Sequence, residues 1–94
     1  MTEWLAEVRV MLKPSVNDPQ GLSIRNALQT LGFDVGDVRA GKFIQVRVNA
    51  TDRVNADRAV HEMCEKLLAN PVIEVYEFTL SEATVSAHTS TSSV

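Results

Sequence analysis

The stretch WLAEVRVMLK, residues 4–13, is the clearest structural signal in the chain. Its even positions are all apolar, namely Trp4, Ala6, Val8, Val10 and Leu12, whereas Glu7, Arg9 and Lys13 on odd positions are charged. A two-residue period of this kind predicts a β-strand with one buried face and one polar face. Pro14 follows and cannot donate a backbone hydrogen bond, so we expect the strand to end there.

A helix is predicted next. Asp18 is a favourable N-cap residue, and the fixed φ of Pro19 suits the first helical position. Apolar residues then recur at helical spacing and form one stripe that is expected to face the core: Ile24, Ala27, Leu28 and Leu31. Gly32 can adopt the left-handed conformation that ends a helix, and Phe33 can fold back onto the last turn.

Two strands joined by a tight hairpin are predicted over residues 35–40 and 43–50. Residues 43–50 alternate between apolar and polar side chains, as a half-buried strand does. Gly41 and Lys42 lie between the two strands, and glycine at the first position of a two-residue loop suits a turn whose twist matches the strands. We therefore expect the chain to reverse at Gly41-Lys42.

A second helix and a fourth strand complete the pattern. Thr51 or Asp52 can cap the helix, and Asn70 with Pro71 can end it. Its apolar face is broad and comprises Ala56, Ala59, Val60, Met63, Cys64, Leu67 and Leu68. Residues 72–80 are rich in β-formers, whereas residues 81–94 are rich in serine, threonine and alanine. We expect one domain over residues 1–80 and a flexible tail over 81–94.

The order strand, helix, strand, strand, helix, strand predicts an α+β fold of the ferredoxin-like, split βαβ type. Such a fold has a four-stranded antiparallel sheet with both helices on one face. The other face would be bare, and it would carry Leu5, Glu7, Arg9, Met11, Phe43, Gln45 and Arg47. This mixture suits burial against another copy, so we predict a homodimer or tetramer that associates through this face.

The totals exclude several classes of protein. The formal net charge is −3 and the nine basic residues are scattered, so neither nucleic acid nor an anionic membrane is an expected partner. No apolar run approaches the ~20 residues of a membrane span, and the N-terminus lacks the pattern of a signal peptide. The single cysteine, Cys64, rules out an internal disulfide and fits a reducing compartment, so a cytoplasmic location is expected.

No constellation of reactive side chains is visible. His61 and Cys64 are three residues apart on the second predicted helix, but the apolar positions around Cys64 favour burial over metal binding. Burial also disfavours a nucleophilic thiolate. The carboxylates are dispersed, and the glycines do not form a phosphate-binding loop. We predict no catalytic residue, no metal site and no cofactor site in this chain.

Four segments carry a resemblance to a known family: LKP at residues 12–14, DPQG at 18–21, DVRAGK at 37–42 and, above all, MCEKLLANPVIE at 63–74. Together they resemble the PurS family over roughly residues 7–78. The resemblance implies the small subunit of phosphoribosylformylglycinamidine (FGAM) synthase in de novo purine biosynthesis, a complex with a glutaminase subunit and a large synthetase subunit. That complex converts formylglycinamide ribonucleotide, ATP and glutamine to formylglycinamidine ribonucleotide, ADP, phosphate and glutamate.

The resemblance further implies that this chain is not catalytic and that the partners hold the reactive groups. ATP, with magnesium expected, would be used by the synthetase subunit. Ammonia released by the glutaminase must reach the synthetase without loss to water, so this chain would dock the two subunits in register. Exposed loops on a rigid scaffold often carry such contacts. The candidate interface residues are Lys13, Pro14, Asp18, Pro19, Gln20, Gly21, Arg39, Gly41 and Lys42.

Two other functions remain open from the sequence. Ferredoxin-like dimers can bind small metabolites at their interface, so a metabolite-sensing regulatory dimer is one alternative. A less favoured alternative is an acylphosphatase-like enzyme, for which Arg39 and Asn49 are the suggestive side chains.

Overall fold

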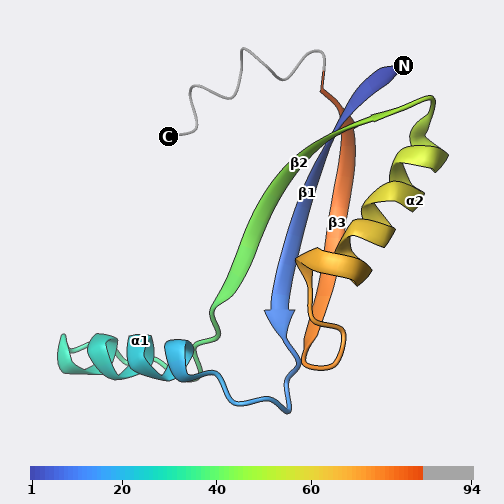
Figure 1. Ribbon diagram of the computed structural model, residues 1–94. Coiled ribbons are helices and arrows are strands. Elements are labelled where there is room, and N and C mark those ends of the chain that lie inside the picture. Colours follow the sequence, from blue (N-terminus) through green and yellow to red (C-terminus); the bar gives the residue numbers. More distant parts are fainter. Residues whose placement is uncertain (84–94) are drawn as a thin grey trace.

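The structure is a computed structural model that describes residues 1–83; the predicted tail lies, apart from residues 81–83, outside the described residues (Figure 1). The elements follow one another as β1 (Thr2–Leu12), α1 (Pro19–Thr30), β2 (Gly41–Ala50), α2 (Arg53–Met63) and β3 (Glu74–Glu82). A π-helical turn at Cys64–Leu68 continues α2. The α+β class is thus confirmed, and β3 ends two residues beyond the predicted strand end at Leu80.

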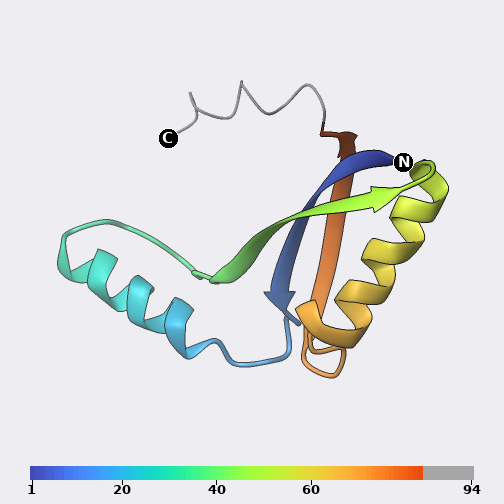
Figure 2. The same ribbon diagram turned by 45° about the horizontal axis from the view of Figure 1, so that its top comes forward.

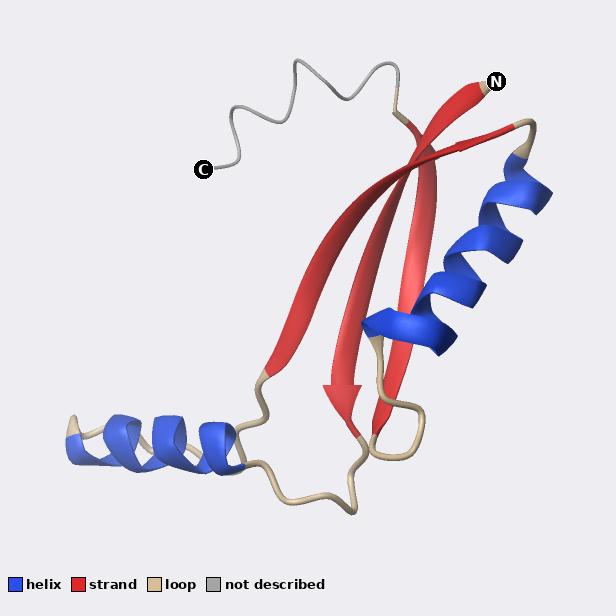
Figure 3. Ribbon diagram, in the orientation of Figure 1, coloured by secondary structure: helices blue, strands red, loops and turns tan. Residues whose placement is uncertain are grey.

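β1 is the central strand of the sheet. Within the described residues the sheet has three strands in the order β2-β1-β3, and both pairings are antiparallel (Figure 3). Val8 is paired with Ile44 of β2 on one side and with Phe78 of β3 on the other. Even-numbered residues of all three strands therefore share one face, and odd-numbered residues share the opposite face, which we call the open face.

The core lies between the even-numbered face and α2. Ala6, Val8, Ala56, Val60 and Cys64 are completely buried. The side chain of Asp52 accepts a hydrogen bond from the Asn55 N–H at 2.9 Å, so Asp52 is the cap that starts α2 over this face. The predicted core role of Cys64 is confirmed.

The end of the second helix differs from the prediction. A regular helix was expected through Leu68, but the Ala69 N–H donates to the Cys64 carbonyl at 3.0 Å, which is a π-type bond that spans five residues. The wider turn keeps Cys64 and Ala69 buried and rotates Leu67 outward, so that Leu67 is 82% exposed. The prediction that Leu67 belongs to the buried face is wrong.

The predicted strand at residues 35–40 and the hairpin at Gly41-Lys42 are also wrong. Gly41 is the first residue of β2 and is paired with Met11, and it does not take the positive φ that the expected turn requires. A Cβ at Gly41 would overlap the Met11 sulfur and lie 2.6 Å from the Val10 carbonyl oxygen. Glycine is therefore needed here because two strands approach closely, and the chain does not reverse.

α1 projects away from the sheet instead of covering it (Figures 1 and 2). Its ends are as predicted: Pro19 is at the start, and Gly32 (φ 96°) ends the helix with Phe33 N–H bonded to the Leu28 carbonyl at 3.0 Å. Its apolar stripe, however, is not in the core, since Ile24 is 39% and Leu31 72% exposed. Both helices were expected on one face, and that expectation is wrong for α1.

We call residues 19–40 the arm; it consists of α1 and the return segment, residues 31–40. The arm makes the molecule extended, with dimensions of 51 × 35 × 15 Å. The Cα radius of gyration is 16.7 Å, whereas a compact domain of this length has about 12 Å.

The packing of α2 on the sheet generates a stability prediction. Val60→Ala removes a fully buried branched side chain and leaves a cavity, so the free energy of unfolding should fall by about 2 kcal/mol. Val54→Ala on the same helix is the matched control, because Val54 is 66% exposed and should change stability by less than about 0.5 kcal/mol. Urea denaturation at one fixed protein concentration measures both. Equal losses in the two variants would contradict the proposed packing.

Candidate interaction site

The candidate interface residues converge at the root of the arm, where β1 ends and α1 and β2 begin. The two carboxylate oxygens of Asp18 accept separate backbone hydrogen bonds, one from the Gly21 N–H at 3.0 Å and one from the Ala40 N–H at 2.7 Å. The first bond caps α1, and the second ties the returning chain to the start of the helix. One side chain therefore joins two segments that are 22 residues apart.

Arg39 completes this junction from the return segment. Its guanidinium donates to the carbonyl oxygens of Lys13 and Val16, both at 2.9 Å, and so holds the loop between β1 and α1. Gly21 lies against the same segment, because a Cβ at this position would overlap the Val38 carbonyl oxygen. We call Asp18, Gly21 and Arg39 the root cluster. These three residues hold the arm in one direction relative to the sheet.

The remaining candidate residues surround the root cluster. The Lys13 N–H donates to the Ile73 carbonyl at 2.8 Å, and the Lys42 ammonium lies 3.8 Å from a carboxylate oxygen of Glu74. Pro14, Pro19 and Gln20 are exposed. The structure thus brings the loop, the start of α1 and the start of β2 together. The Asp18 carboxylate and the Arg39 guanidinium form hydrogen bonds with the backbone of this same chain.

The charge of Asp18 is stabilised by these backbone contacts. Hydrogen bonds from the N–H groups of Gly21 and Ala40 lower the pKa of Asp18 from its ordinary value of 3.8, and the nearby Arg39 guanidinium adds to the shift. Asp18 is thus ionised at neutral pH, and its ionised form favours the arm root.

The predicted self-association residues all lie on the open face, because they occupy odd positions of β1 and β2. At one end the polar residues are paired with one another: Gln45 donates to Glu7 at 3.2 Å, and Arg47 lies 3.7 Å from Glu3. Leu5 is half-buried there. Few polar side chains at this end of the open face therefore remain free to bind another protein.

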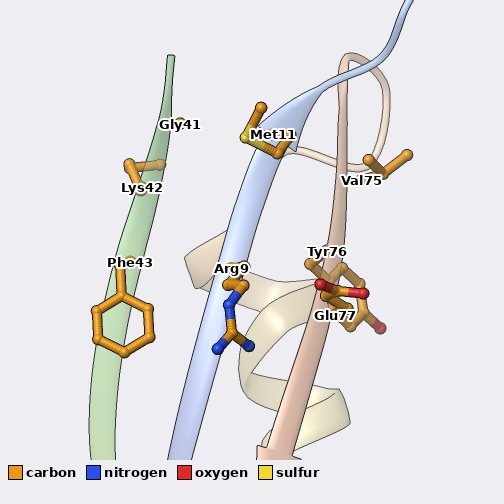
Figure 4. Close-up of a pocket in the computed structure, with 8 residues that line it drawn as sticks. All are labelled: Arg9, Met11, Gly41, Lys42, Phe43, Val75, Tyr76 and Glu77. Atoms are coloured by element: carbon orange, nitrogen blue, oxygen red, sulfur yellow. The ribbon is translucent and has the colours of Figure 1, made fainter. Parts of the chain in front are cut away.

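The other end of the open face is more apolar (Figure 4). Met11, Phe43 and Val75 are 37%, 56% and 48% exposed, and the Arg9 guanidinium carbon lies 5.5 Å from the centre of the Phe43 ring. These residues line a shallow pocket together with Glu77. The sequence analysis missed Val75 and Glu77, although the alternation within residues 72–80 places odd positions on this face. An apolar patch flanked by the cations Arg9 and Lys42 is a surface suited to a protein contact.

The residues that suggested chemistry have structural roles. Burial raises the pKa of the Cys64 thiol, which disfavours a reactive thiolate. The His61 ring makes edge contacts with Tyr76 and Phe78 at 5.6 Å, and Tyr76 donates to a Glu65 carboxylate oxygen at 2.8 Å. Within residues 1–83 no group of three or more histidine, cysteine or acidic side chains is placed to hold a metal ion. No helix among these residues has the length and apolarity to cross a membrane.

The root cluster generates a pH prediction. Asp18→Asn keeps one side-chain acceptor but places an NH₂ group opposite the Ala40 N–H, which needs an acceptor. Hydrogen exchange of the Ala40 backbone N–H should therefore be faster than in the unmodified chain. Because the folded pKa of Asp18 is depressed, its stabilising effect is complete well above pH 3.8 and is lost as pH falls through the folded pKa. The difference in stability between the two proteins should therefore shrink from pH 6 to pH 3.

Asp34→Asn is the matched control for this experiment, because Asp34 is an exposed carboxylate in the same arm. It should leave exchange at Ala40 unchanged. A difference between Asp18→Asn and the unmodified chain that stays constant over the whole pH range would contradict the role of the ionised carboxylate.

Comparison with known proteins gives a consistent result. A sequence model of the PurS family, described as phosphoribosylformylglycinamidine (FGAM) synthase, matches residues 5–82. The PurS subunit of phosphoribosylformylglycinamidine synthase from Bacillus subtilis is 47% identical over 77 residues, which are 81% of this chain and 90% of that protein.

Solved structures agree with the sequence match. A crystal structure of Bacillus subtilis PurS superposes with a TM-score of 0.76 at 45% identity and covers 84% of this chain and 99% of that one. A chain in a structure of PurLQS from Thermotoga maritima gives a TM-score of 0.80 at 34% identity and covers 86% of this chain and 100% of that one. This chain, with its projecting arm, therefore belongs to the PurS family.

Proposed function

We propose that this chain is the assembly subunit of an FGAM synthase in purine biosynthesis and docks the glutaminase subunit to the synthetase subunit. The observation that carries the proposal is the match to the Thermotoga maritima chain in PurLQS, which is covered over its whole length. Because 86% of this chain matches the whole of that chain in fold, the same kind of assembly is the simplest role for this one. ATP and its magnesium are assigned to the synthetase subunit, and the reaction to the cytoplasm.

The side chains of the described region support a role in contacts. Asp18 and Tyr76, whose pKa values are shifted, are engaged in hydrogen bonds that hold segments of the chain together. Two surfaces are available instead: the exposed residues around the root cluster and the apolar end of the open face. We assign the first to the large partner subunits and the second to protein contacts that include self-association. Neither assignment requires a reactive group on this chain.

The positions of Arg39 and Asn49 argue against the acylphosphatase-like alternative, which needs both side chains in one site. Arg39 donates its hydrogen bonds to Lys13 and Val16 at the root, whereas Asn49 is paired with Glu3 at the far end of β2. Eight strand residues, 41–48, lie between Arg39 and Asn49 and span roughly 26 Å, so the two side chains cannot act on one substrate. The metabolite-sensing alternative predicts saturable thermal stabilisation of the isolated chain by an amino acid or nucleotide. The assembly role predicts no such shift.

Reconstitution tests the proposal. The glutaminase and synthetase subunits are mixed with and without this chain, and product formation is followed with glutamine and, separately, with an ammonium salt. Omission of this chain should abolish most of the glutamine-dependent rate, because ammonia then escapes between undocked sites. The ammonia-dependent rate should change little, because free ammonia reaches the synthetase from solution.

The ammonium reaction is the internal control for an intact synthetase. Equal glutamine-dependent rates in the two mixtures would contradict a docking role. Equal loss of both rates would mean that the chain acts on the synthetase itself and not on the transfer of ammonia.

A further inference from the structure

We propose that Asp18 and Arg39 are positioning residues of the assembly. They fix the angle between the two contact surfaces of this chain, and this angle determines whether ammonia passes from the glutaminase to the synthetase. The inference rests on the proposed function, because it assigns a role within the same complex. It adds a specific claim to that function: binding both partners is not sufficient, and one rigid joint within this chain sets their geometry.

The two contact surfaces meet at the root of the arm. One is the loop surface, which we define as the exposed residues Pro14, Pro19 and Gln20. The other is the apolar end of the open face, which begins at Gly41, the residue that follows Ala40 of the root (Figure 4). The covalent path between the two surfaces runs around the whole arm, whereas the hydrogen bonds of the root connect them directly.

A single carboxylate forms the first of these connections. One oxygen of Asp18 accepts from the Gly21 N–H at 3.0 Å and holds the start of α1, which carries part of the loop surface. The other oxygen accepts from the Ala40 N–H at 2.7 Å, next to the first residue of β2. Hydrogen bonds to an ionised carboxylate are short and strong. The second bond therefore resists any change of angle between the start of α1 and the start of β2.

Arg39 forms the second connection, on the other side of the loop. Its Nη2 atom donates to the carbonyl oxygens of Lys13 and Val16, both at 2.9 Å, and the segment between these two residues contains Pro14. A planar guanidinium fixes its acceptors in one geometry, which the rotatable ammonium of a lysine does not do. The loop thus cannot move relative to the start of β2 without breaking these bonds.

Polar contacts carry this joint because little apolar packing supports it. Gly21 is the buried residue of α1, and it offers no side chain to a core. Ammonia has to pass between two docked sites that are sealed from water, so a small change of angle opens the junction. A misplacement of about 1 Å can cost positioned reactants roughly a hundredfold in rate. The stiffness of the root is therefore a functional requirement of a docking subunit.

Asp18→Ser tests the joint and preserves the helix cap. The serine hydroxyl can still accept from the Gly21 N–H, but it has no second oxygen for the Ala40 N–H. Asp52→Ser is the matched control, because it makes the same change at the cap of α2, which acts through the Asn55 N–H. Hydrogen exchange at Ala40 should become faster in Asp18→Ser and stay unchanged in Asp52→Ser.

The reconstituted synthase supplies the functional readout. Each variant is titrated into fixed amounts of the glutaminase and synthetase subunits, and product and glutamate are measured with glutamine and, separately, with an ammonium salt. At saturating Asp18→Ser, the ratio of the glutamine-dependent rate to the ammonium-dependent rate should fall by roughly tenfold. More glutamate should be released for each product formed. The concentration of chain that gives half of the effect should stay close to that of the unmodified chain.

Arg39→Met is a second variant that does not touch the helix cap. It keeps much of the length of the side chain and removes the donors, so it should lower the same ratio of rates. Arg53→Met is its matched control, because Arg53 also donates to a backbone carbonyl, that of Leu80 at 3.1 Å, but lies at the start of α2. Arg53→Met should leave the ratio unchanged.

The titration separates positioning from simple contact. A loss that disappears at saturating chain would mean that Asp18 and Arg39 only strengthen binding, and it would overturn the positioning role. Equal ratios for the root variants and the unmodified chain, or equal losses in the two controls, would also overturn it. All of these results leave the proposed function standing. If the unmodified chain gives no increase in the glutamine-dependent rate, the proposed function fails, and this inference fails with it.

Discussion

The pairing of β1 with strands on both of its sides is the constraint on which the rest of the structure depends. Because β1 is central, its even-numbered side chains are buried under α2, and Ala6 and Val8 are completely inaccessible to solvent. Burial of this face sets the register, since a shift by one residue would turn Glu7 and Arg9 into the core. The open face follows directly: the odd-numbered residues must lie together on the other side.

The root cluster holds the arm so that it extends away from the sheet. Asp18, Gly21 and Arg39 join the end of β1, the start of α1 and the start of β2 by backbone hydrogen bonds and one close contact. These interactions do not bury much apolar surface, but they fix a direction for the arm. A chain of this kind contributes geometry to an assembly, which agrees with its membership of a family of small synthase subunits.

Local signals predicted the parts of the fold that depend on neighbouring residues. The alternation in residues 4–13 and 43–50, the caps Asp18 and Asp52 and the left-handed Gly32 were all readable, because each acts within a few residues. The π-helical turn was not, since it depends on how Cys64 and Ala69 together meet the sheet. Gly41 was misassigned because glycine serves equally a tight turn and a close approach of strands.

The sequence by itself therefore determined three of the strands, the starts of both helices and the two faces of the sheet. Only the tertiary structure decided where α1 lies and whether residues 35–40 pair with β2. The physical reason is that an apolar stripe specifies burial without specifying the chain that covers it. A periodic pattern is the same for a helix that packs on its own sheet and for one that packs on a neighbour.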